Sequence, residues 1–141
     1  MILHCNYEEL GALRQGANVL LGHGGRGGGA PIAAPPEGRA EVEALLPRLE
    51  GDLTIETLVE QRWVARAIQA IVESLKEEMD LFIITAHPAD EAAVASYFQY
   101  GHALAVMARV AEMGQEMEAL IEVVTGAPPS PEVAKTFFFP G

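Results

Sequence analysis

The sequence is poor in cysteine, in aromatic residues and in basic residues, and each shortage argues against a class of protein. Cys5 is the only cysteine in 141 residues, so no internal disulfide can form and we expect a reducing, cytoplasmic location. Only 6% of the residues are aromatic, which favours packed aliphatic helices over an aromatic binding cleft. The 9 basic residues face 20 acidic ones, and a net charge of -11 repels a phosphate backbone, which argues against nucleic acid as a partner.

Long uninterrupted hydrophobic runs are also missing. The N-terminal residues contain no basic region and no apolar run of signal-peptide length. The best candidate for a membrane span, residues 92–111, is rich in alanine and carries Ser96, Gln99, His102 and Arg109, which are costly in lipid. We therefore predict a buried helix of a soluble protein, with no membrane partner.

No cofactor or metal motif stands out. Residues 22–27 match the letters of the G-x-G-x-x-G dinucleotide fingerprint, but they follow a predicted helix and precede prolines, so we interpret the match as coincidental. His4 and Cys5 lack the additional spaced ligands of a zinc site. None of the four histidines has a glutamate three residues before it, as di-iron bundles require. We predict no cofactor, no metal and no catalytic residue, and we favour a non-enzymatic protein.

Two stretches repeat hydrophobic residues in alternating steps of three and four. This 3.5-residue spacing is typical of helices that pack along their lengths. The first repeat comprises Leu58, Gln61, Ala65, Ile68, Val72, Leu75, Met79 and Phe82, and the second comprises Ala103, Val106, Val110, Met113, Met117, Leu120 and Val124. Because Pro88 lies between them, we predict a long antiparallel helical hairpin over residues 54–126. In that register residue 79 faces residue 97, and residue 66 faces residue 110.

Local signals mark the ends of the predicted helices. Thr57 followed by Glu60 forms a capping-box pattern, and Pro88 suits the first turn of a helix. Gly126 suits the end of the second helix. Residues 81–85 have a composition that also fits a strand, but the repeat continues into them, so we predict helix.

The other segments of this single domain, residues 1–141, are shorter. They are an N-terminal strand and helix at 1–22, a flexible glycine- and proline-rich linker at 23–38, a short helix at 39–50 and a C-terminal tail at 127–141. Residues 52–55 are expected to pair as a short strand with residues 1–5. Because three exposed phenylalanines favour aggregation, we expect those at 137–139 to pack on the protein's own body or on the second subunit. The alternative is a hydrophobic hook that binds another protein.

The predicted fold class is therefore all-α with a minor β pair, and its apolar surface exceeds what one hairpin can bury. Residues 92–111 are apolar or small on nearly every face, and such a helix must be surrounded. A homodimer with a four-helix core would supply the cover. The predicted interface consists of Gly101, Ala105, Ala108, Leu104, Met107, Val64 and Ile71. The sequence leaves open whether the N-terminal helix docks on its own chain or on the second subunit.

Two functions from different classes fit these features. The first is a homo-oligomeric interaction or scaffold module without catalytic activity, which could also bind another protein. The second is a helical bundle that binds a small ligand or metal. Its predicted polar pocket comprises Tyr97, Tyr100, His102, Glu73 and Lys76. Buried tyrosines and a hydrogen-bonded histidine in a structural role explain the same residues.

Overall fold

The computed structural model describes residues 1–23, 36–85 and 90–140. These residues are mostly helical, with one short antiparallel β pair, in agreement with the sequence-based prediction. In chain order the elements are β1 (Ile2–Leu3), α1 (Tyr7–Leu20), α2 (Pro36–Leu45), the 3-10 helix η1 (Leu46–Arg48), β2 (Leu53–Thr54), α3 (Leu58–Ile84), α4 (Glu91–Thr125) and α5 (Pro131–Thr136). Most of the predicted linker at 23–38, much of the fingerprint match at 22–27 and Pro88 lie outside the described residues.

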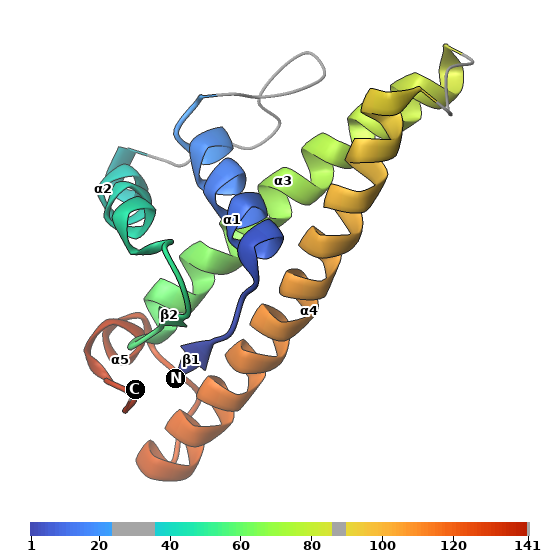
Figure 1. The fold of residues 1–141 in the computed structure, drawn as a ribbon. Helices are drawn as coiled ribbons and strands as arrows, with labels where there is room; N and C mark the ends of the chain where they lie inside the picture. The colour runs from blue at the N-terminus through green and yellow to red at the C-terminus, as the bar shows by residue number, and fades with distance from the viewer. Residues whose placement is uncertain (24–35, 86–89, 141) are drawn as a thin grey trace.

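The two longest helices, α3 and α4, run antiparallel and pack against each other (Figure 1). The Thr57 hydroxyl accepts a hydrogen bond from the backbone N–H of Glu60 at 3.2 Å and so caps the start of α3. Gly126 ends α4 in the left-handed conformation, with φ 76°. Since α3 continues to Ile84, the strand-like residues before Thr85 are helical, as predicted.

The register of the hairpin follows from two polar contacts between α3 and α4. Near the tip, the Ser96 hydroxyl donates to the Glu78 carboxylate at 3.2 Å, in agreement with the predicted level. Nearer the base, the buried Gln61 side chain donates to the Val110 carbonyl oxygen at 2.9 Å. The prediction instead paired Val110 with residue 66, so the observed register at the base differs from it by five residues, or about one and a half helical turns.

The last part of the predicted seam on α4 is wrong. Leu120 is 44% exposed and Val124 is exposed, whereas Ile121 is fully buried in the core. Ile121 follows Ala103 by 18 residues, which is five turns of a straight helix at 3.6 residues per turn. A strict 3.5-residue repeat drifts around such a helix, so it selects the wrong residue after several turns.

Helix α1 docks on its own chain, across α3 and α4. Asn6 and Glu9 form a capping box at its start, and Gly22 follows its end with φ 85°. At Gly16 the backbones of α1 and α3 touch, because an added Cβ would lie 1.9 Å from the Ala67 carbonyl oxygen. The docking site of the N-terminal helix, which the sequence left open, is therefore the same chain.

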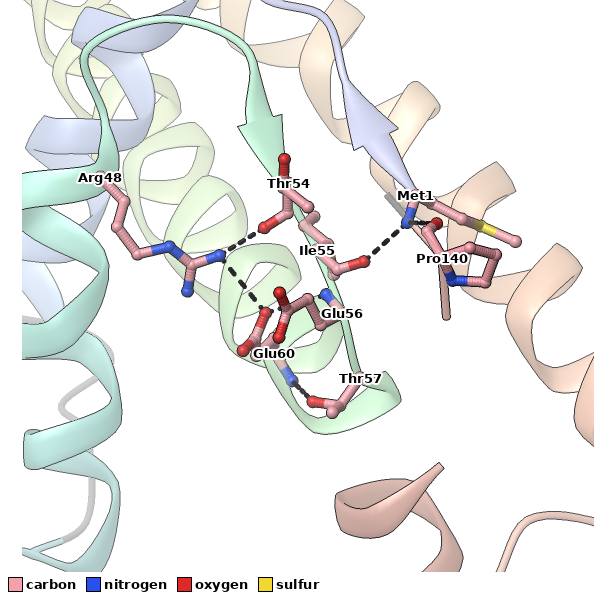
Figure 2. A network of polar contacts seen from close by, with 8 residues as sticks. All are labelled: Met1, Arg48, Thr54, Ile55, Glu56, Thr57, Glu60 and Pro140. Carbon is pink, nitrogen blue, oxygen red and sulfur yellow. Dashed lines mark hydrogen bonds and ion pairs between the residues drawn. The ribbon is translucent and has the colours of Figure 1, made fainter. Parts of the chain in front are cut away.

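The two ends of the described chain meet at the base of the hairpin. β1 pairs with β2 in the register Ile2 to Thr54 and Leu3 to Leu53. The amino group of Met1 donates to the carbonyl oxygens of Ile55, at 2.9 Å, and Pro140, at 3.0 Å (Figure 2). The N-terminal strand and the C-terminal tail are thus both fastened to the segment that leads into α3.

The C-terminal tail packs on the body of the protein. The backbone N–H of Phe139 donates to the Glu56 carbonyl oxygen at 2.8 Å, and the Phe139 ring is only 5% exposed. The ring centroids of Phe137 and Phe139 are 5.0 Å apart. Phe138, by contrast, is 67% exposed. The predicted packing of the phenylalanines on their own chain is confirmed for Phe139.

Arg48 adds a polar link between η1 and the start of α3 (Figure 2). Its guanidinium donates to the Thr54 carbonyl oxygen and to the Glu60 carboxylate, the latter at 3.4 Å. The same Glu60 carboxylate accepts the backbone N–H of Glu56 at 3.0 Å. In the part of the chain that the structure describes, no helix is long and apolar enough to cross a membrane.

Candidate interaction surface

The outer side of α4 is apolar over many turns. No Asp, Glu, Lys or Arg occurs between Glu91 and Arg109. On the inner side of this stretch, Ala103 and Val106 are buried against the rest of the chain. On the outer side the exposed residues include Val94, Phe98, Gly101, Leu104, Ala105 and Ala108. The described structure therefore leaves a charge-free, largely apolar side of α4 exposed to solvent.

A groove of about 440 Å³ runs between α3 and α4 on the side away from α1. We call this side of the hairpin the groove face. Its lining residues are Ala65, Ile68, Gln69, Val72, Glu73 and Lys76 of α3 together with Tyr100, Leu104, Met107 and Ala111 of α4. Most of them are apolar, and the charged Glu73 and Lys76 lie on the α3 side. An apolar floor beside charged groups resembles the core and rim of a protein–protein interface.

A second groove, of about 560 Å³, lies between α1 and α4. Its lining residues are Tyr7, Glu8, Gly11, Arg14, Gln15, Asn18, Ala95, Phe98, Gln99 and His102. The side-chain amides of Gln99 and Gln15 are joined by a hydrogen bond of 2.6 Å at its wall. The sequence did not predict this groove, because it depends on where α1 crosses α4.

The predicted polar pocket is not assembled as one site. Tyr100, Glu73 and Lys76 line the groove face, whereas His102 lines the α1–α4 groove and Tyr97 lines neither of the two. Residues two apart on a helix point in nearly opposite directions, which is why Tyr100 and His102 lie on different sides of α4. The structure therefore brings together three of the five residues.

The residues predicted to form a dimer interface also separate into two groups. Gly101, Leu104, Ala105 and Ala108 are exposed on α4, and Met107 is half-buried in the groove. Val64 and Ile71 are buried in the core that α1, α3 and α4 share. Their apolar surface is covered by the chain itself, so they are not on the surface of the described structure.

The exposed side of α3 has an uneven charge distribution. Toward the base it carries Arg62 and Arg66, and toward the tip it carries the exposed acidic residues Glu77 and Asp80. The Arg66 guanidinium lies over the Trp63 ring, 5.0 Å from its centroid. Because Arg66 and Asp80 are each seven residues from Glu73, two turns away in either direction, both lie on the same side of α3 as the groove.

Titratable groups gather near the base but do not form a metal site. The His4 Nδ1 and Asp52 Oδ2 atoms are 2.9 Å apart, and this hydrogen bond lowers the pKa of the Asp52 carboxyl. Burial raises the pKa of the half-buried Cys5 thiol, and this effect outweighs that of nearby Arg109, which lowers it. Burial therefore disfavours the reactive thiolate. Across residues 1–23, 36–85 and 90–140, no three His, Cys, Asp or Glu side chains are grouped to hold a metal.

Comparison with protein-family models, with curated proteins and with solved structures finds no match for this chain. The function is therefore argued from the groove face and the exposed side of α4. This surface belongs to a helical hairpin with shorter helices packed on one side and an apolar, partly charged groove on the other.

Proposed function

We propose that this protein is a non-catalytic, self-associating interaction module. Two copies pair through the groove face, so that two α3–α4 hairpins form a four-helix core. The observation that carries the proposal is the exposed apolar side of α4 beside the groove, in a helix without charge between Glu91 and Arg109. Leaving such a surface in water loses the free energy of apolar burial, which a second hairpin recovers.

The size of the groove face suits a stable dimer. From Arg62 to Ile84, α3 rises about 33 Å at 1.5 Å per residue, and two packed helices are roughly 20 Å wide. The resulting face, of about 600 to 700 Å², approaches the roughly 800 Å² that each partner buries in a typical specific complex.

Analytical ultracentrifugation of the untagged protein tests the proposal, with Leu104→Glu as the disrupting variant. Leu104 lines the groove and is partly exposed, so a carboxylate there would be buried on pairing. We expect the unchanged chain to sediment at twice 15.1 kDa and Leu104→Glu at the monomer mass. Ala119→Glu, on an exposed position of α4 beyond the groove, serves as the matched control and should remain dimeric. A monomeric wild-type protein at about 100 μM would exclude the proposal.

Small-ligand binding in the same groove is the second candidate function. It is favoured by the presence of Tyr100, Glu73 and Lys76 around one apolar groove. A dimer of the proposed kind would cover this groove, so the two functions make different predictions. Native mass spectrometry should show an adduct that is lost in Tyr100→Phe and Lys76→Met if a ligand is bound. A clean polypeptide mass favours the interaction module.

A further inference from the structure

We infer that the second copy lies antiparallel on the groove face, related by a twofold axis level with Glu73 on α3 and Gly101 on α4. The inference rests on the proposed self-association and adds its register. The contact between Ser96 and Glu78 shows which residues of α3 and α4 lie at the same height along the hairpin. Because α3 and α4 run in opposite directions, five residues on from Ser96 is Gly101, and five residues back from Glu78 is Glu73.

Charge complementarity on α3 supports this arrangement. A twofold axis at Glu73 places Arg66, seven residues toward the base, opposite Asp80, seven residues toward the tip, of the second copy. Because of the twofold symmetry, the Arg66–Asp80 pair forms twice, once from each copy. Lys76 lies one turn from the axis, within reach of Glu73 on the other copy. Parallel alignment of the two α3 helices would instead set Arg66 against Arg66 and Asp80 against Asp80.

Gly101 supports the same axis independently. Apart from its two chain neighbours and the nearby backbone of its own helix, no described atom lies within 4 Å of a Cβ added to Gly101, so packing within the chain does not require glycine there. Its φ is not among the positive values of the described glycines, Gly22 and Gly126. Glycine inside a helix costs about 1 kcal/mol relative to alanine. Close approach of a second α4 at the axis gives this residue a function, because it leaves room for Tyr100 of the other copy.

A charge-swap experiment tests the register. Arg66→Glu and Asp80→Lys should each weaken dimerisation about tenfold, because each turns two attractive pairs into repulsive ones. The double variant Arg66→Glu/Asp80→Lys restores opposite charges across the axis and should bring the dissociation constant to within about threefold of wild type. Lys135→Glu, an exposed charge reversal on α5, is the control and should leave the dimer unchanged.

Gly101→Leu tests the axis in a second way. A Cβ at this exposed position meets open space within the monomer, so we expect unchanged helix content by circular dichroism while the dimer dissociates. The matched Ala119→Leu should stay dimeric. A wild-type dimer that Gly101→Leu leaves intact and that the double charge swap fails to rescue would overturn this register but not self-association. A monomeric wild-type protein would exclude both the register and self-association.

Discussion

Ser74 and Ser96 are both buried serines of the hairpin, but their hydroxyls differ in hydrogen bonding. Within the described residues, the Ser74 hydroxyl has no hydrogen-bond partner. The Ser96 hydroxyl donates to Glu78 and lies 3.1 Å from the Ala92 carbonyl oxygen. A buried polar atom without a partner destabilises a protein, whereas a bonded one contributes modestly to stability.

Replacement of Ser74 by alanine is therefore expected to stabilise the protein. Removing the unpaired hydroxyl, and gaining alanine's higher helix propensity, should raise the free energy of unfolding by about 1 to 2 kcal/mol. Ser96→Ala should lower it by about 1 kcal/mol, because its bonds are lost. Urea denaturation at one fixed protein concentration measures both. A lower stability for Ser74→Ala would mean that its hydroxyl is bonded in solution.

Several helix ends were predictable because their signals lie in neighbouring residues, but two helix starts were not. α4 begins at Glu91 and not at Pro88, and α2 begins at Pro36, three residues before the predicted short helix. Asn6 with Glu9, Thr57 and Gly126 act as helix-end signals in the structure as they do in the sequence. The residues that line the groove face were less predictable. Its residues come from two helices, so a small error in rotation or register changes which side chains meet. Tyr100 and His102 illustrate this, as does Ile71, which is buried in a core cluster that includes residues of α1.

The last turns of α4 allow a test of the seam itself. Ile121 is fully buried, whereas the adjacent Leu120 is 44% exposed. We expect Ile121→Ala to lower the free energy of unfolding by about 2 to 5 kcal/mol, since it leaves a cavity in the core. Leu120→Ala should cost less than about 1 kcal/mol. Similar chemical-denaturation midpoints for the two variants would place Leu120 in the seam, as the 3.5-residue repeat predicted.

At the scale of the whole molecule, the two short strands and the C-terminal tail gather at the base of the hairpin. There the β pair and the C-terminal tail lie beside the start of α3, α1 crosses the middle of the hairpin, and the tip extends beyond them (Figure 1). Phe139 inserts its ring into the core, and its backbone bonds to Glu56. The tail is thus part of the fold of the described chain.

Two neighbouring phenylalanines test the contribution of the tail. Phe139→Ala should lower the free energy of unfolding by about 3 to 5 kcal/mol, because a large buried side chain is removed. Phe138→Ala removes a side chain that is 67% exposed and should cost less than about 1 kcal/mol. Thermal melts followed by circular dichroism compare them directly. Equal melting temperatures for the two variants would show that the tail is not anchored.

The bond between the Met1 amino group and the Pro140 carbonyl oxygen has a mechanical consequence. A pulling force applied at the two ends would act first on this contact, on the two-residue strands and on Phe139. We expect these contacts to break in sequence, beginning at the ends of the chain. The long seam between α3 and α4 would carry the load only after the base had opened. The hairpin is thereby shielded from tension that enters through the ends of the chain.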